Sequence, residues 1–444
     1  MDMKNKKNKN KQWKGLLLSA GFLSLVLLGT TAISVAVRTV NDTDPVSPAL
    51  CVIAEENEMA KAGVRGNPIA FEHDDFARAM NLATVSEITV TQVPPISDGE
   101  LRLGSVVVGN GQSIRGDNLS LLSYVASDAD IATSSFRFRV GSSPVEMTCR
   151  LYLLEKPNQA PTLSMVPKAS LNVSTHRDVT LYGTLPCYDP EGDETIVEIV
   201  SYPSSGFLIL KDRHTGEYVY LPKEGASGKD SFTYVARDRY GNYSASATVS
   251  LSVLTPSTSA SYADLRELPC HHAALSLTEA GIMNGMKIGS ELYFHPTQSV
   301  TRGEFVVMAM KSLGMTEVMP TEKTVFSDDA EFSLEERNFV GAAYELGYVH
   351  GEYTEGGLCF SPDREITRAE AAVILGNMID AATPTVTPVF DDSSEIPAWA
   401  ASSVYSLSSM GILPATDGNI SPMSSLTRGD AAMMLHALIR TTEA

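Results

Sequence analysis

Three copies of one short motif lie in the C-terminal part of the chain. Each copy has a Thr, an Arg, a small residue and an acid, and the copies begin 66 and 60 residues apart: Thr301-Arg302-Gly303-Glu304, Thr367-Arg368-Ala369-Glu370 and Thr427-Arg428-Gly429-Asp430. A Pro stands five residues before each Thr, and an apolar residue stands two before each Pro. Self-similarity at this period indicates a repeat architecture, in which each copy is one supersecondary unit.

The motif predicts the start of a helix. A Thr at the N-cap and an acid three residues later form a capping box, which satisfies two backbone N–H groups that a helix leaves unpaired. The apolar residues that follow, such as Ala371, Ile374 and Leu375, fall on one helical face. The helix dipole does not favour an Arg at the first helical position. We expect the guanidinium and the helix N-terminus to form an anion site. The alternative is a salt bridge that ties adjacent repeats together.

These motifs resemble the S-layer homology family in its triplicate arrangement, with repeats over 262–316, 317–382 and 383–444. Phe326-Ser327-Asp328 and Phe390-Asp391-Asp392 are similar to the family's F-x-D opening. The resemblance implies a three-pronged helical bundle that binds secondary cell-wall polysaccharide, often pyruvylated, in grooves between the prongs. It implies polymer contacts by Arg302, Arg368, Arg428, Asp328, Asp392 and Trp399. Of the three copies, the third alone has the family's Trp.

The middle of the chain has the period-two alternation of half-buried strands, as in Phe136 to Val140 (FRFRV). It predicts two antiparallel β-sandwich modules, over 83–156 and 157–254, followed by a linker over 255–261. The modules share a weak internal echo, since each reaches an F-x-[FY] strand, at Phe136 and at Phe232. The expected fold class is therefore multidomain α+β, with two Ig-like or cadherin-like sandwiches before a three-repeat α-helical bundle.

Asp189-Pro190-Glu191-Gly192-Asp193 and Asp238-Arg239-Tyr240-Gly241-Asn242, with the strand motifs between them, resemble bacterial cadherin-like and Ig-like repeats. Such repeats on cell surfaces often bind calcium, so the resemblance implies a calcium site. Asp189, Glu191, Asp193 and Asp238 offer the oxygen ligands that calcium prefers. The alternative is that these acids cap turns. No other cofactor is expected.

The N-terminus has the layout of an export signal. Six Lys precede an apolar run from Gly15 to about Gly29, and small residues follow. This pattern predicts a signal peptide over 1–36 and a linker region over 37–82. The alternative is an uncleaved anchor, since the apolar stretch extends to Val37, which is long enough to span a bilayer.

Composition excludes several classes of function. Residues 1–38 hold seven basic residues and one acid, so the remainder carries 27 basic and 52 acidic residues, a net charge of −25. Such a body is a poor nucleic-acid binder. Five Cys, widely spaced and odd in number, exclude a disulfide scaffold and a Cys-based zinc module. Cys270-His271-His272 lacks further ligands at a suitable spacing, which favours a buried or solvated cluster over a metal site.

The sequence therefore predicts a non-enzymatic, exported surface protein of a Gram-positive-type bacterium. Its helical bundle would hold the wall polysaccharide, and its β modules would act as a spacer or an adhesion element toward other surface proteins. No P-loop, GxGxxG, HExxH or GxSxG motif is present, and no catalytic residue is expected. Two alternatives stay open: a wall-associated hydrolase with its active module in residues 40–156, and a membrane-anchored envelope tether.

Overall fold

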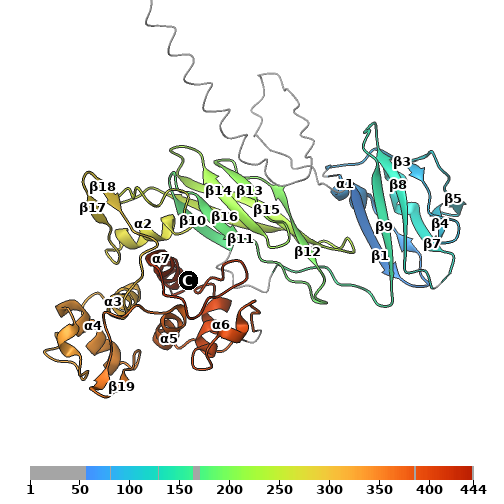
Figure 1. The fold of residues 1–444 in the computed structure, drawn as a ribbon. Coiled ribbons are helices and arrows are strands. Elements are labelled where there is room, and N and C mark those ends of the chain that lie inside the picture. Colours follow the sequence, from blue (N-terminus) through green and yellow to red (C-terminus); the bar gives the residue numbers. More distant parts are fainter. Residues whose placement is uncertain (1–56, 81, 129, 164–170, 385–386, 443–444) are drawn as a thin grey trace, which may run out of the picture. The chain divides into compact units, whose positions relative to one another are not determined.

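The computed structural model describes residues 57–80, 82–128, 130–163, 171–384 and 387–442 (Figure 1). The expected signal peptide or anchor, and the first part of the expected linker region 37–82, lie outside the described residues. Within the described ranges, no helix is both long enough and apolar enough to cross a membrane.

The first β module has two sheets. Their strand orders are β1-β9-β8-β3-β6 and β2-β7-β4-β5. The elements are β1 (Glu58–Val64), β2 (Ile69–Ala70), α1 (His73–Ala79), β3 (Glu87–Gln92), β4 (Gly99–Leu103), β5 (Val106–Val107), β6 (Gln112–Arg115), the 3₁₀ turn η1 (Gly116–Leu121), β7 (Leu122–Ala126), β8 (Thr133–Val140) and β9 (Met147–Leu154). Residues of both sheets share one core.

The first β module begins earlier than residue 83, the boundary that the sequence predicted. Strand β1 pairs with the last strand, β9, over seven residues. Phe71 and Phe76 are buried and pack edge-on against Phe136 and Phe138 of β8, with ring centroids 5.6 and 5.2 Å apart. The Pro residues and the polar composition before residue 83 gave no sign of β1, because the strand that pairs with it, β9, lies far along the chain.

The second β module has the sheets β10-β16-β15-β12 and β11-β14-β13. Its strands are β10 (Asn172–His176), β11 (Leu181–Thr184), β12 (Thr195–Ser201), β13 (Gly206–Leu210), β14 (Glu217–Pro222), β15 (Gly228–Asp238) and β16 (Ala247–Leu254). Phe136 and Phe232 lie on β8 and β15, each of which pairs with the last strand of its own module. The internal echo in the sequence therefore marks equivalent strands.

Neither β module is wholly antiparallel, which corrects the sequence prediction. The first strand of each module pairs in parallel with the last strand, β1 with β9 and β10 with β16. A parallel pair needs a long crossover. Here the rest of the module supplies that crossover, so no local turn signal could reveal the pairing.

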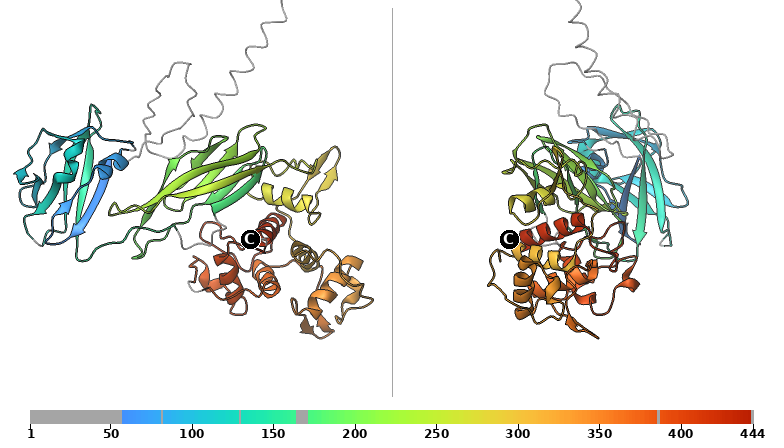
Figure 2. Two further views of the ribbon diagram at one scale, coloured as in Figure 1. Left: turned by 180° about the vertical axis from the view of Figure 1, so that it is seen from behind. Right: turned by 60° about the vertical axis from the view of Figure 1, so that its left-hand side comes forward.

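The C-terminal part alternates helices with small hairpins. Its elements are α2 (His271–Glu279), β17 (Met286–Ile288), β18 (Glu291–Tyr293), α3 (Arg302–Ser312), η3 (Asp329–Glu331), α4 (Leu334–Glu345), β19 (Glu352–Thr354), β20 (Gly357–Cys359), α5 (Arg368–Met378), η4 (Ser393–Glu395), α6 (Ala401–Ser409) and α7 (Arg428–Thr442). A single bridge between Thr416 and Asn419 stands where the first two copies have a hairpin. The motif helices α3, α5 and α7 lie together in the middle of this C-terminal part (Figures 1 and 2).

A closed ring of backbone hydrogen bonds joins the three motif segments. The N–H of Val300 donates to the carbonyl of Leu426, that of Leu426 to Ile366, and that of Ile366 back to Val300, at 2.9, 2.8 and 3.0 Å. All three side chains are fully buried. Since each residue immediately precedes a motif Thr, the ring brings the three helix starts to one axis.

Each motif helix starts with the expected cap. The N–H of Glu304 donates to Thr301 Oγ1 at 3.3 Å, and the N–H of Thr301 donates to Glu304 Oε2 at 3.1 Å. The equivalent bonds of Thr367 with Glu370 measure 3.2 and 2.9 Å. Those of Thr427 with the shorter Asp430 measure 3.1 and 3.4 Å.

Thr367→Ala should lower the free energy of unfolding of the helical part by about 1 kcal/mol, because the N–H of Glu370 loses its acceptor. Urea denaturation followed by circular dichroism at 222 nm would measure this loss. Thr316→Ala, at an exposed position beyond α3, is the matched control and should change nothing. Equal stability of Thr367→Ala and the parent chain would contradict a role for the cap.

Candidate functional site

The backbone amides at the start of each motif helix are already occupied. The N–H of Arg302 donates to Arg364 O at 2.9 Å, and that of Gly303 to Pro362 O at 3.0 Å. The third N–H of this helix goes to the Thr301 cap. The other two motifs repeat the arrangement, with donors and acceptors as follows: Arg368 to Ser424, Ala369 to Pro422, Arg428 to Gln298 and Gly429 to Pro296. The backbone amides of the helix N-termini therefore cannot contribute to the expected anion site, because carbonyl groups of the neighbouring repeat already accept from them.

The motif Arg side chains span the junctions between repeats. Arg302 Nε donates to Phe360 O at 3.2 Å, and its Nη2 lies 3.5 Å from His350 O. Arg368 Nε and Nη2 donate to Ile420 O and Pro414 O at 2.7 and 2.6 Å. Arg428 closes the circle with bonds of 2.9 Å to Phe294 O and to Asn284 O of the first copy.

Acids of the motif face two of these guanidinium groups. Arg302 Nη1 lies 3.2 Å from Glu370 Oε1, and Arg368 Nη1 lies 3.3 Å from Asp430 Oδ1. Arg428 makes no ion pair with any residue that the structure describes, although Glu304 acts on it at longer range. Burial lowers the pKa of all three Arg side chains from its usual value, and the acids partly offset that effect. The structure thus gives Arg302 and Arg368 the salt bridges between repeats that the sequence left as an alternative.

The opening acids hold a strained turn. Asp328 accepts hydrogen bonds from the N–H groups of Phe360 and Ser361, and Asp392 accepts them from Ile420 and Ser421. Ser361 and Ser421 have φ angles of 60° and 51°, in the left-handed region that non-glycine residues seldom adopt. Asp264 does the same for His295 in the first copy. These carboxylates are therefore engaged with the backbone.

Trp399 lies just before α6 and is 57% exposed. The residues near the matching positions in the other copies are not aromatic. In the second copy Glu335 pairs with Lys311 at 2.6 Å, and in the first copy Cys270 is buried at the N-cap of α2. Trp399 consequently offers an aromatic surface that the other two copies lack.

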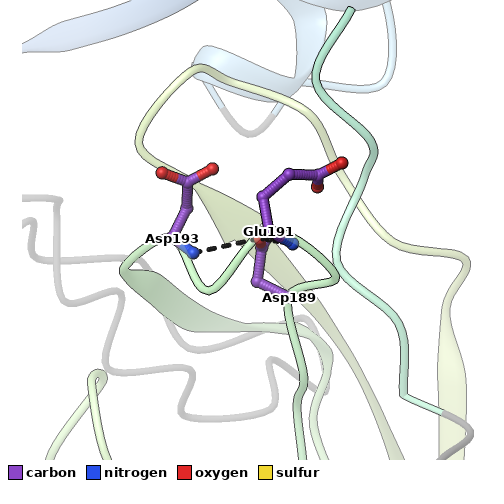
Figure 3. Close-up of side chains that lie close together, drawn as sticks. All are labelled: Asp189, Glu191 and Asp193. Atoms are coloured by element: carbon purple, nitrogen blue, oxygen red, sulfur yellow. Dashed lines mark hydrogen bonds between the residues drawn. The ribbon is translucent and has the colours of Figure 1, made fainter.

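The acids of the second β module form two matching turns. Asp189 Oδ1 accepts from the N–H groups of Glu191 and Asp193, both at 3.0 Å (Figure 3). Asp238 Oδ1 accepts from the N–H groups of Tyr240 and Asn242 at 2.8 and 2.9 Å. The D-x-x-G-[DN] pattern that occurs at both places could have revealed their equivalence. Turn capping, the alternative from the sequence, is present in the structure.

One oxygen of this cluster has no partner. Asp189 is 5% exposed, and its Oδ2 is buried without a hydrogen bond. Ligand oxygens of Asp189, Glu191 and Asp193 lie within 4.8 Å of one another. Burial, together with repulsion from Asp189, raises the pKa of Asp238 above its usual value. The group is therefore an oxygen-rich cluster with uncompensated negative charge.

Amide side chains that the sequence analysis missed complete this cluster. Asn158 Nδ2 donates to Asp193 Oδ2 at 2.8 Å, and Asn158 Oδ1 accepts from Asn242 Nδ2 at 2.7 Å. Gln159 Nε2 donates to Glu191 Oε1 at 2.9 Å. Asn158 and Gln159 belong to the PNQAP segment, which the sequence indicated only as a strand breaker.

Arg368→Lys should destabilise the helical part by about 2 kcal/mol. Lys keeps the charge, but it loses the planar fork that serves two carbonyl groups and Asp430 at once. Chemical denaturation would measure the change. Arg115→Lys, at a side chain that is 79% exposed in the first β module, is the matched control. An unchanged unfolding midpoint for Arg368→Lys would mean that the Arg does not hold the repeats together.

Comparison with known proteins identifies two of the modules. Residues 158–252 match the bacterial Ig domain, and residues 325–372 and 389–432 match the S-layer homology domain. The surface-layer 125 kDa protein of Lysinibacillus sphaericus is 26% identical over 212 residues, which are 46% of this chain and 17% of that protein. An endoglucanase of Bacillus sp. (strain KSM-635) is 30% identical over 152 residues, 33% of this chain and 15% of that protein.

A third relative is the exoglucanase XynX of Acetivibrio thermocellus, which is 27% identical over 169 residues, 37% of this chain and 15% of that protein. The chain thus spans about a sixth of the length of these curated relatives. Residues 158–252 form a bacterial Ig domain, and residues 325–372 and 389–432 belong to the S-layer homology family.

Proposed function

We propose that this chain is an exported cell-surface protein that binds secondary cell-wall polysaccharide non-covalently through three S-layer homology repeats. Residues 262–316 are the proposed first repeat, beside the two that match the family. The observation that carries this proposal is the ring of Val300, Ile366 and Leu426, which needs one segment from each of three equivalent units. The likeness to a surface-layer protein supports a place at the cell wall of a Gram-positive-type bacterium.

The β modules act as a spacer or adhesion element in this proposal. S-layer homology and Ig domains are anchoring and scaffolding modules, which supports a non-enzymatic chain. The two glucanase relatives leave open the alternative of a wall-associated hydrolase with its active module in residues 40–156. Release of reducing sugar from purified walls by the chain would favour that alternative, and its absence would favour the anchor.

Polymer contacts are proposed at the exposed parts of the junctions. Trp399 supplies a flat aromatic face, and Arg428 has an Nη1 group that no described acid pairs with. An acidic sugar such as a pyruvylated residue can accept hydrogen bonds from that guanidinium. Arg302 and Arg368 would have to exchange Glu370 and Asp430 for the polymer. Asp328 and Asp392 would act indirectly, because they shape the turns beside the guanidinium groups.

The full chain should sediment with purified walls and stay in solution with walls stripped of their polysaccharide. Trp399→Ala should weaken binding about tenfold, as the loss of an aromatic anchor does. Tyr353→Ala is the matched control, since Tyr353 is an 87% exposed aromatic residue on the β19 hairpin. Equal sedimentation with stripped and intact walls would contradict polysaccharide binding.

We also propose that the second β module holds a calcium ion. Asp189, Glu191, Asp193 and Asp238 would hold it, and the unpartnered Asp189 Oδ2 is the observation that favours it. Calcium would neutralise carboxylates that otherwise repel one another, and it would supply no chemistry beyond this stabilisation. Asp189 Oδ1 can keep capping its turn while Oδ2 binds the ion.

Free calcium at 100 times its dissociation constant should stabilise the bacterial Ig domain by about 2.7 kcal/mol, because the ion binds the folded state alone. Asp189→Asn should remove this effect, since Asn keeps an oxygen for the turn but loses the charge. Asp212→Asn is the matched control: Asp212 caps the turn at His214 and Thr215 in the same module. Melting curves with calcium and with a chelator decide, and identical curves would leave only the turn-capping role.

A further inference from the structure

Histidines that are far apart in the sequence meet where strand β10 packs on helices α2 and α7. His176 of β10 is fully buried, and His272 of α2 is 7% exposed. Their Nδ1 atoms lie 2.9 Å apart. The ring of His436, from α7, lies edge-on to His272 with centroids 4.8 Å apart. The junction between the bacterial Ig domain and the helical part is therefore built around imidazole rings.

When both imidazole rings are neutral, the hydrogen-bond donors and acceptors allow a single arrangement of the protons. Glu279 Oε2 lies 3.2 Å from His176 Nε2, and an ionised carboxylate can only accept, so His176 carries its proton on Nε2. His176 Nδ1 is then an acceptor, and His272 must donate from its own Nδ1. His272 Nε2 in turn accepts from Ser174 Oγ at 3.3 Å. Two neutral imidazole rings therefore satisfy every contact in this series of hydrogen bonds.

The series of hydrogen bonds from Glu279 through the two His rings to Ser174 can accommodate one added proton but not two. With one, His176 becomes doubly protonated beside Glu279 and donates from Nδ1, while His272 changes tautomer and donates from Nε2 to Ser174. With a second proton, both Nδ1 atoms carry hydrogen and face each other at 2.9 Å. Two positive rings would then be in contact in a buried junction, where such charges interact strongly.

The surrounding groups make this junction a poor place for positive charge. The titratable or charged groups that face it are His176 from β10, His271, His272 and Glu279 from α2, His436 and Arg440 from α7, and Tyr218 from β14. Glu279 is the one carboxylate of this set, and Arg440 adds a permanent positive charge that donates to Asn172 O at 2.6 Å. Among the described residues, no three of these side chains bring ligand atoms together as a metal site requires.

Burial and the neighbouring cations act in the same direction on the pKa values of His272 and His436. They lower the pKa of His272 well below its usual range and that of His436 to about 4. A solvated His binds its proton near pH 6.5. When the bacterial Ig domain and the helical part are separated, the solvated His residues bind protons at a higher pH than they do in the closed junction. Acidification from pH 6.5 toward 4 therefore favours separation.

We propose that His176, His272 and Glu279 form an acid-sensitive latch, which holds the bacterial Ig domain on the helical part at neutral pH and releases it when the junction takes up a second proton. Release needs no unfolding of either part, because the bacterial Ig domain has a core cluster of its own. Val179 is the one Ig-domain residue in the core cluster of the helical part, and release would expose it. The latch would make the placement of the β modules relative to the wall anchor depend on the acidity at the cell surface.

Small-angle X-ray scattering of the full chain between pH 7.5 and 4 tests this latch, with far-UV circular dichroism as the check on folding. The radius of gyration should rise on acidification while the circular dichroism stays constant. Glu279→Gln should move the midpoint of this rise upward by ~1 pH unit, because the carboxylate no longer stabilises the first added proton. The Gln oxygen can still accept from the N–H of Ser257, which Glu279 Oε1 accepts now.

Further variants separate the latch from general acid expansion. The double variant His176→Gln and His272→Gln should abolish the transition, while His214→Gln, an exposed His paired with Glu194 outside the junction, should keep it unchanged. A constant radius of gyration in the parent chain would overturn the proposal, as would an unshifted midpoint in Glu279→Gln. If the double variant is expanded at every pH, the Glu279→Gln midpoint alone decides.

Discussion

Three backbone hydrogen bonds hold the helical part together, and its other features follow from them. Val300, Ile366 and Leu426 each donate to one and accept from another, so a closed ring forms from segments that are 60 and 66 residues apart. Buried peptide groups need partners. Because the partner of each lies in another repeat, no single repeat can satisfy its own central segment. Three units are required, which explains why the motif occurs in triplicate.

The ring also explains the role of the motif Arg. It brings the start of each helix against the Pro loop of the neighbouring repeat, whose carbonyl groups accept from the first two amides. The guanidinium lies at the same boundary, with carbonyl acceptors on Nε and Nη2. A buried cation without such partners would be costly, and Lys could not reach several acceptors in one plane. The Arg is thus a structural element of the junction as well as a candidate polymer contact.

The β modules rely on the same principle of closure by distant segments. In both modules the first strand lies in parallel beside the last, so a sheet edge is completed by two ends of one module. The acids of the bacterial Ig domain illustrate how one residue can serve two roles. Asp189 uses one oxygen to cap its turn and leaves the other buried and unpartnered. Turn capping and cation binding are compatible there, although the sequence presented them as alternatives.

The sequence by itself determined the repeat, the capping boxes, the strands that hold Phe136 and Phe232, and the identity of the two families. These are local properties, written in spacing and alternation, as in Thr367 with Glu370 or Phe136 with Phe138. Only the tertiary structure decided what the motif Arg contacts, where the first β module begins and which His residues meet. Arg302 donates to Phe360, β1 pairs with β9, and His272 contacts His176. The partners in each pair are too far apart in the sequence for a local pattern to predict the contact. The physical reason is that these contacts satisfy buried polar groups, and the partner that satisfies such a group is chosen by packing.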